Sequence, residues 1–152
     1  MRILGIDLGR RRIGLAVSDV TRTLATPLRT LERGPSDRRA VNELAAIVET
    51  MTNESDGLGL IVVGLPRRLD GTASEETAHV SEIVDALRRR VRVPVVTQDE
   101  RLSSHEAESR LALRERDWRK RKARLDAAAA AVILQDYIDA HAPPALEDGE
   151  TS

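Results

Sequence analysis

Residues 58–64 are apolar at every position and lack the alternation of a strand with one wet face. A short run this rich in Leu, Ile and Val predicts a central β-strand that is covered on both faces. Such a strand needs helices above and below its sheet. This segment therefore predicts an α/β domain with helices on both faces of the sheet.

Three further strands are predicted at the start of the chain, over residues 3–8, 13–19 and 25–31. The first two flank a short arginine turn, so a hairpin is their simplest connection. Pro27 has no backbone N–H and therefore places the third strand at an edge of the sheet. The chain is thus expected to begin with three antiparallel strands.

Helical spacing of apolar residues appears on both sides of the central segment. Ser36 is expected to cap a first helix, and Thr72 with Glu75 forms a T-x-x-E capping box for a second. The positions expected to face the sheet are Val41, Leu44, Ala45, Ile47, Val48 and Met51 in the first helix, and Val80, Ile83, Val84 and Leu87 in the second.

A fifth strand is predicted over residues 93–97. Ser103 and Glu106 form another capping box, which predicts a third helix, and the last helix should run from about residue 125 to 140. The later strands are joined through helices and should be parallel. The expected fold is α/β, with a mixed five-stranded sheet of three antiparallel strands followed by parallel ones.

Cysteine is absent, which excludes disulfides, thiolate zinc sites and cysteine nucleophiles. The three histidines, His79, His105 and His141, lack zinc-site spacing, so any metal ion must be held by carboxylates. No apolar stretch reaches the roughly 18 residues of a membrane span, and a cytoplasmic protein without a membrane partner is expected. The 152 residues fit one domain, predicted over residues 1–141 and followed by an acidic, disordered tail at 142–152.

Charge is distributed unevenly along the chain. The net charge is −1, yet residues 110–124 hold eight basic residues against two acidic ones, a local charge of +6. This segment is predicted to be partly loop, because apolar residues such as Leu113 and Trp118 are sparse in it. It could be a phosphate-binding surface or simply a solvated helix face, and charge alone leaves both interpretations open.

Three carboxylates, Asp7, Glu100 and Asp126, stand where predicted elements end or begin. Each has a simpler explanation: a turn residue, a partner for Arg101, and a favourable charge at a helix start. Asp7 fits its explanation least, because a carboxylate between apolar neighbours needs a counter-charge or a metal.

The five alanines at 127–131 would let the last helix approach the sheet closely and bring Asp126 toward Asp7. If Glu100 converges there too, the three carboxylates form a site suited to Mg²⁺ or Mn²⁺.

Four blocks of sequence occur in an order that is typical of one known family. They are GIDLG at 5–9 with RIGLAVSD at 12–19, GLP at 64–66 with DG at 70–71, DERLSS at 99–104, and Asp126 with AA at 128–129 and ILQ at 133–135. Together they resemble the YqgF/RuvX family of Holliday junction resolvases, also described as pre-16S rRNA nucleases. The resemblance runs from about residue 2 to residue 139 and implies a ribonuclease H-like fold.

The resemblance also implies roles for the three acids. Asp7, Glu100 and Asp126 match the family's catalytic and metal-binding residues, and the implied reaction is metal-assisted phosphodiester hydrolysis with Mg²⁺ or Mn²⁺. Two ions would activate a water molecule and stabilise the leaving oxygen.

One departure from other resolvases of this fold concerns the second acid. Those enzymes carry it at the end of the central strand, where this chain has Gly64-Leu65-Pro66. Asp99 is therefore a reserve candidate for the metal site, and Asp19 or Asp70 could assist it.

Nucleic acid should be held mainly through its phosphates, because Trp118 and Tyr137 are the only aromatic residues. The expected phosphate contacts come from the arginines beside the acids and from the basic segment. These residues are Arg10, Arg11, Arg12, Arg101, Arg119, Lys120, Arg121, Lys122 and Arg124.

Three functions are compatible with these residues. Maturation of the 5′ end of pre-16S rRNA is preferred, with resolution of four-way DNA junctions in recombination and repair as the alternative, and a non-catalytic nucleic-acid or ribosome-associated binding protein as the third. An actin-like phosphotransferase is disfavoured, because such enzymes resemble two domains and this chain supplies one. Junction resolution requires paired active sites and hence a homodimer, whereas a monomer could trim RNA, with ribosomal particles as a further partner.

Overall fold

A five-stranded mixed sheet forms the centre of the molecule. The computed structural model describes residues 1–66, 70–99 and 118–141, with side chains in the last range from residue 127 onward. The strands are β1 (Arg2–Leu8), β2 (Arg12–Ser18), β3 (Ala25–Glu32), β4 (Leu58–Leu65) and β5 (Val95–Asp99), in the spatial order β3-β2-β1-β4-β5. Strands β1 to β3 are antiparallel, and β4 and β5 run parallel to β1, which confirms the predicted arrangement.

Strand β3 forms an edge of the sheet, as Pro27 predicted. Its pairing with β2 shifts between Leu15, opposite Arg29, and Ala16, opposite Pro27, so that Leu28 is an extra residue in a bulge. A proline and a bulge both discourage the addition of another strand.

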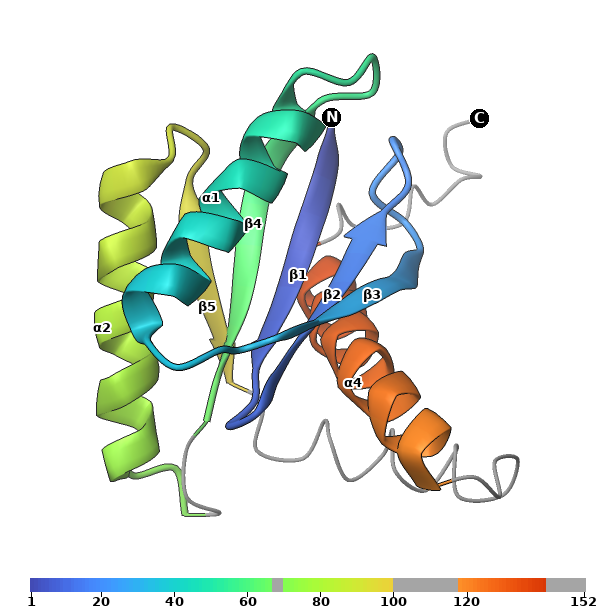
Figure 1. Ribbon diagram of the computed structural model, residues 1–152. Coiled ribbons are helices and arrows are strands. Elements are labelled where there is room, and N and C mark those ends of the chain that lie inside the picture. The colour runs from blue at the N-terminus through green and yellow to red at the C-terminus, as the bar shows by residue number, and fades with distance from the viewer. Residues whose placement is uncertain (67–69, 100–117, 142–152) are drawn as a thin grey trace.

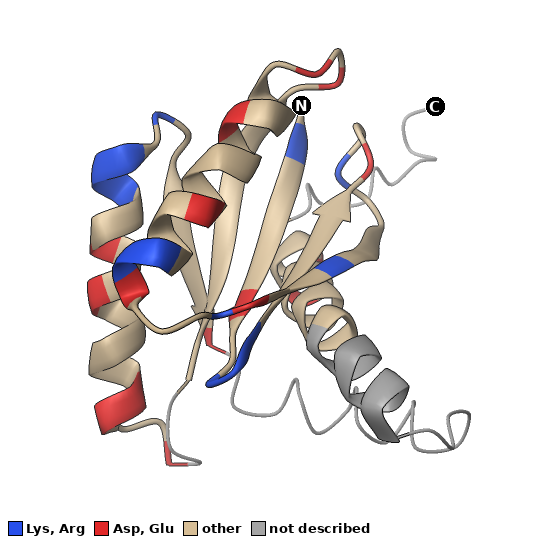
Figure 2. Ribbon diagram, in the orientation of Figure 1, with Lys and Arg blue, Asp and Glu red and all other residues tan. Residues whose placement is uncertain are grey.

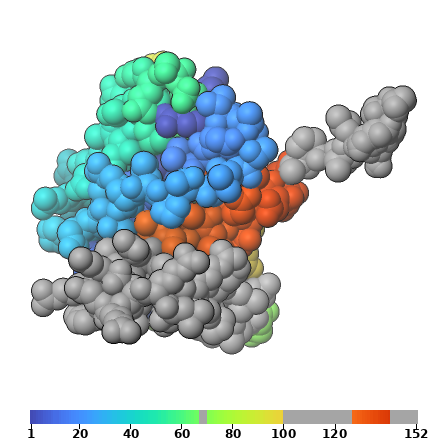
Figure 3. Space-filling view, turned by 90° about the vertical axis from the view of Figure 1, so that its right-hand side faces the viewer, coloured from blue at the N-terminus to red at the C-terminus, as the bar shows by residue number. Residues whose placement is uncertain are grey.

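Helices cover both faces of the sheet, as the apolar central strand requires. Helices α1 (Asp37–Thr52) and α2 (Glu75–Arg90) lie on one face, and α4 (Trp118–His141) lies on the other (Figure 1). Seen from the side, α4 packs beneath β3 (Figure 3). No helix within the described ranges is both long enough and apolar enough to cross a membrane.

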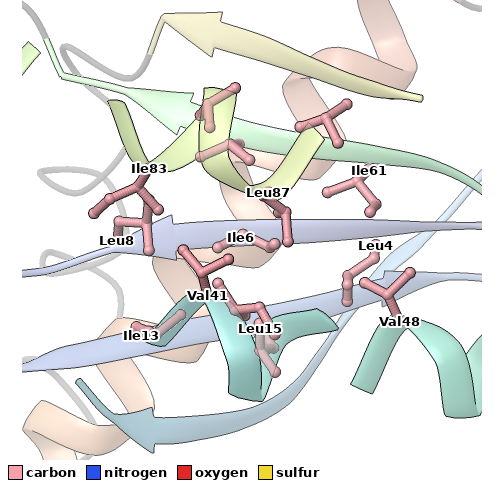
Figure 4. Packing of buried hydrophobic residues seen from close by; sticks show 14 of the residues in the cluster. Leu4, Ile6, Leu8, Ile13, Leu15, Val41, Val48, Ile61, Ile83 and Leu87 are labelled. Carbon is pink, nitrogen blue, oxygen red and sulfur yellow. The ribbon is translucent and has the colours of Figure 1, made fainter. Parts of the chain in front are cut away.

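The larger core lies between the sheet and helices α1 and α2. Alternate residues of β1 and β2 point to this side and meet apolar positions of both helices (Figure 4). The labelled members are Leu4, Ile6, Leu8, Ile13, Leu15, Val41, Val48, Ile61, Ile83 and Leu87. The helix faces predicted from apolar spacing are thus the faces that are buried.

The smaller core lies under α4, and there the helix approaches the sheet closely. Ile3 and Val62 of the sheet pack with Ala130, Ile133 and Leu134 of α4. A Cβ on Gly5 would stand 2.8 Å from the Cβ of Leu134 and 3.1 Å from the carbonyl oxygen of Ala130. The close approach expected from the alanine run is confirmed, because Ala127, Ala129 and Ala130 are all buried.

Two predicted boundaries were wrong. Strand β5 begins at Val95 instead of residue 93, because Pro94 has no N–H and pairing with β4 begins at Ile61 opposite Val95. Helix α4 begins at Trp118, seven residues before its predicted start, so residues 118–124 of the basic stretch are helical, while residues 110–117 lie outside the described part of the chain. The spacing of apolar residues reveals a helix only where one of its faces is buried, and this basic stretch contains few apolar residues.

The predicted start of α2 was also wrong. Its N-cap is Ser74, whose hydroxyl accepts from the backbone N–H of Thr77, while the Thr77 hydroxyl accepts from the Ser74 N–H. Thr72 is bound instead to Asp70, through its backbone N–H at 2.9 Å and its hydroxyl at 2.7 Å. Thr72 therefore belongs to a turn that it forms with Asp70, and helix α2 begins after this turn. The helix predicted from Ser103 and Glu106 and the tail at 142–152 lie outside the described residues.

Candidate active site

The parallel strands β1, β4 and β5 have their carboxyl ends at the same end of the sheet. Asp7, the first of the predicted acids, lies there. Leu65 of β4 is paired with Asp99, the last residue of β5, and Ile6 of β1 is paired with Val63. Asp7 is therefore the second-to-last residue of β1, next to the end of the sheet at which these strands finish. The basic β1–β2 turn emerges from the same end of the sheet (Figure 2).

Asp7 faces α4. Residues of one strand alternate between faces, and Gly5, two positions earlier, lies against that helix. Asp7 is half-buried between Ile6, which is fully buried, and Leu8, which is 3% exposed. Its partner on β2 is Gly14, and Gly64 follows the residue of β4 that pairs with Ile6. The residue directly opposite Asp7 on β2 and the corresponding residue of β4 are thus both glycines.

Asp126 lies in α4, four residues before Ala130, and its side chain is outside the described part of the chain. The helix begins at Trp118, so Asp126 is two turns inside it rather than in its first turn. The helix dipole acts on charges within the first turn. The simpler explanation for Asp126, a favourable charge at a helix start, is therefore removed.

The end of β5 separates two neighbouring candidates. Asp99 is paired with Leu65, which belongs to the core under α1 and α2, so Asp99 shares that face and not the face of Asp7. Gln98 is paired with Gly64 and shares the face of Asp7. Asp99 as a reserve ligand is thus on the wrong side of the sheet, and Glu100 and Arg101 lie outside the described residues.

Asp19 lies just beyond the end of β2, at the opposite edge of the sheet from the end of β1. Its oxygens accept from the backbone N–H groups of Leu24 and Thr23 and from the hydroxyls of Thr21 and Thr23. The N–H of Leu24, the hydroxyl of Thr21 and the N–H of Thr23 hold the pKa of Asp19 well below its usual value. Asp19 therefore organises the β2–β3 loop and does not assist the site.

Asp70 precedes α2, in the connection that follows the site end of β4. It is exposed, and its Oδ1 accepts both bonds from Thr72. Its described contacts are those of a turn residue.

The predicted phosphate-binding residues fall into two groups. Arg10 and Arg11 are exposed in the β1–β2 turn, while Arg12 begins β2 and is half-buried. Arg119, Lys120, Arg121, Lys122 and Arg124 belong to the first two turns of α4, and their side chains are outside the described part. The first group therefore lies three to five residues beyond Asp7, in the connection from β1 to β2.

The chemistry of the predicted ligands suits a hard divalent cation. They are three carboxylates with no histidine or thiol among them, and the described one, Asp7, is half-buried. Oxygen ligands of this kind select Mg²⁺ or Mn²⁺. Within the described side chains, no group of three or more acidic, histidine or cysteine residues is placed to hold a metal ion.

Two features of this site were not predicted from the sequence. One is the pair Gly14 and Gly64, which depends on strand register and gives no local signal. The other is Arg33, whose Nη1 donates to the carbonyl oxygen of Gly9 at 2.8 Å. A basic residue between the end of an edge strand and a Gly-Pro turn was the only available indication.

Comparison with known proteins gives consistent results. The model of the family described as RuvX, Holliday junction resolvase, matches residues 1–140. A protein of Anaeromyxobacter dehalogenans strain 2CP-1 named "Putative pre-16S rRNA nuclease" is 43% identical over 143 residues, which are 94% of this chain and all of that protein. A protein of Chloroflexus aggregans with the same name is 40% identical over 142 residues, covering 93% of this chain and 96% of its own.

Solved structures show the same fold. RuvC from Thermus thermophilus superimposes with a TM-score of 0.53 at 19% identity, covering 92% of this chain and 95% of RuvC. Its complex with a Holliday junction substrate gives 0.50 at 18% identity, covering 92% of this chain and 94% of that one. The ribonuclease H-like fold is thereby confirmed. The family match spans nearly the whole chain, and the protein accordingly belongs to the RuvX Holliday junction resolvase family, a family of nucleases.

Proposed function

We propose that this protein is a metal-dependent endonuclease that matures the 5′ end of pre-16S rRNA in the cytoplasm. Asp7, Glu100 and Asp126 form its catalytic site and hold Mg²⁺ or Mn²⁺. The observation that carries the proposal is the contact of Gly5 with Ala130, because it relates the backbone positions of Asp7 and Asp126.

Backbone geometry supports the proposed convergence of Asp7 and Asp126. Strand β1 runs toward the end of the sheet that carries the candidate site, while α4 runs away from that end (Figure 1). Asp7 lies two residues beyond Gly5, about 7 Å along the strand. Asp126 lies four residues before Ala130, about 6 Å along the helix in the same direction. Both positions are therefore displaced from one contact point by similar distances toward the same edge.

Glu100 is favoured over Asp99 by strand alternation. Gln98 shares the face of Asp7 and Asp99 faces the other side, which counts against Asp99 and leaves Glu100 as the acid that the family resemblance assigns. This assignment supplies an acid from the residue that follows β5 in the chain, and β5 is separated from β1 by β4.

The basic start of α4 supports a role in binding phosphate. Its first turn contains no acidic residue and includes Arg119, Lys120 and Arg121. Cations at a helix N-terminus oppose the helix dipole, at a cost of about 0.3–1 kcal/mol each. Helix stability therefore does not explain these residues, whereas contact with a polyanion does.

A bound divalent ion would supply an activated water and charge stabilisation for the leaving oxygen. The carboxylates of Asp7, Glu100 and Asp126 would orient that ion. Arg10 and Arg11, in the turn after Asp7, would hold the flanking phosphates. In this arrangement one short segment provides both the first acid and the first phosphate contacts.

Two observations support different substrates. The names of relatives that are about 40% identical over nearly their whole length favour precursor rRNA. The description of the family favours a four-way DNA junction, which requires two active sites and hence a homodimer. We prefer the RNA precursor because those relatives share more of this sequence than the resolvases of the same fold.

Labelled pre-16S rRNA fragments and labelled four-way DNA junctions, each incubated with Mg²⁺ or Mn²⁺, decide between these substrates. Cleavage of the RNA near the mature 5′ end, with the junction left intact, is the expected result. Cleavage of the junction alone, by a protein that sediments as a dimer, would replace the proposal with junction resolution. Binding of both without cleavage would point to a non-catalytic binding protein.

A further inference from the structure

Arg33, just beyond the end of β3, joins the end of β1 to helix α1. Its Nη1 donates to the carbonyl oxygen of Gly9 at 2.8 Å, and its Nη2 donates to Oδ1 of Asp37 at 3.3 Å. Its backbone N–H donates to the carbonyl oxygen of Arg11 at 2.9 Å. The side chain is only 12% exposed. One residue thus binds the β1–β2 turn at two points.

The turn that Arg33 holds is tight and sterically restricted. The N–H of Gly9 donates to the carbonyl oxygen of Asp7 at 3.2 Å. A Cβ on Gly9 would stand 2.7 Å from the carbonyl oxygen of Arg12. The inner side of the turn is therefore closed by its own backbone, and Arg33 holds the turn at the carbonyl oxygens of Gly9 and Arg11.

Arg33 is itself fixed from the helical side. Asp37 lies in the first turn of α1, and its second oxygen, Oδ2, lies 3.0 Å from Nε2 of His79 in α2. The planar guanidinium reaches Gly9 and Asp37 at once, which the single ammonium of lysine cannot reproduce. The contacts therefore run from α2 through α1 to the turn beside Asp7.

We propose that Arg33 is a positioning residue for the nuclease reaction. It holds the segment from Asp7 to Arg11 through Gly9, so that the carboxylate and the phosphate-contacting arginines keep a fixed relation to each other. This inference rests on the proposed function, because it assigns Arg33 to the site that Asp7, Arg10 and Arg11 form. Arg33 acts through the backbone of the turn and does not touch the substrate.

Arg33→Lys and Arg33→Met test the proposal, with Arg29→Met as the matched control. Arg29 is an exposed arginine of β3, the strand that ends one residue before Arg33. Displacements of about 1 Å at a reacting centre cost up to about 100-fold in rate. We expect kcat to fall about 10- to 100-fold in both Arg33 variants, with KM nearly unchanged, and both constants to stay at the wild-type level in Arg29→Met.

Other results would overturn the assignment. A raised KM with unchanged kcat would make Arg33 a direct phosphate contact. A kcat loss that disappears when the variants are assayed well below their unfolding temperature would make it a general stabilising residue. Wild-type kcat in Arg33→Met would leave it no role in the reaction.

A second measurement does not depend on cleavage. Amide hydrogen exchange of Gly9 should be about tenfold faster in Arg33→Met than in the wild type and unchanged in Arg29→Met. Unchanged exchange at Gly9 would overturn the proposal even in an active enzyme. If the wild type cleaves neither nucleic acid, the proposed function fails, and the exchange result alone decides whether Arg33 holds the turn.

Discussion

Gly5 of β1 lies against the backbone of α4, because a Cβ there would stand 3.1 Å from the carbonyl oxygen of Ala130. The same Cβ would stand 2.8 Å from the Cβ of Leu134, closer than unbonded carbons approach. Gly5→Ala should therefore displace the helix and lower the free energy of unfolding by about 1–3 kcal/mol. Urea unfolding measures this change.

The same displacement should reduce nuclease activity, because α4 also carries Asp126. Ala46→Ser on the exposed side of α1 is the control and should change stability by less than about 0.5 kcal/mol. A Gly5→Ala variant as stable as the wild type would mean that the helix is not held at this distance.

The start of α2 gives a prediction about capping. Ser74→Ala removes the acceptor for the Thr77 N–H and should lower the free energy of unfolding by about 1 kcal/mol. Thr72→Ala, at the cap position expected from the sequence, should change it by less than about 0.5 kcal/mol. Chemical denaturation of both variants compares them directly, and the reverse order would restore the cap at Thr72.

The loop after β2 should make stability depend on pH in the acid range. The pKa of Asp19 is lower in the folded protein than the value of about 3.9 in an unfolded chain. Its ionised form therefore stabilises the fold above about pH 4, and this contribution is lost as the pH falls toward the lower folded value. Urea midpoints measured from pH 6 to pH 2 should fall less steeply for Asp19→Asn. Identical slopes would show that the loop contacts do not favour the carboxylate.

The basic start of α4 predicts a particular salt dependence. If Lys120 and Lys122 contact phosphates, the double variant Lys120→Gln/Lys122→Gln should bind precursor RNA more weakly, and the slope of log affinity against log salt should decrease by about two units. Arg92→Gln, an exposed arginine between α2 and β5, is the control. An unchanged slope in the double variant would mean that this segment is a solvated helix face and does not bind phosphates.

Local patterns predicted most of the sheet and the two helices on its first face. The apolar run at 58–64 became the central strand, Pro27 placed β3 at the edge, and Ser36 caps α1. Each of these features depends on neighbouring residues alone. The sequence therefore contains the signal in one place.

The start of α4 could not be predicted in this way. Residues 118–124 contain no glycine or proline and are mostly good helix formers, but they lack the apolar spacing by which the other helices were recognised. A prediction that combined intrinsic helix propensity with apolar periodicity would place the start of this helix earlier.

The site itself is only partly readable from sequence. The unusual position of Asp7 between Ile6 and Leu8 was visible, and so was the alanine run that permits close packing. The glycines beside Asp7 and the contact of Arg33 with Gly9 arise from pairing between distant strands. Register and side-chain reach decide such contacts, and no local pattern encodes them.

The Asp7→Asn variant is the sharpest test of metal-dependent cleavage at this site, because it removes one charge and keeps the shape of the side chain. The wild type, Asp7→Asn and the control Asp19→Asn are incubated with labelled pre-16S rRNA and Mg²⁺ or Mn²⁺, and Mn²⁺ binding is measured by calorimetry. Asp7→Asn should lose both cleavage and Mn²⁺ binding while remaining folded, and Asp19→Asn should retain both. Cleavage by Asp7→Asn at the wild-type rate would show that Asp7 is not a catalytic residue.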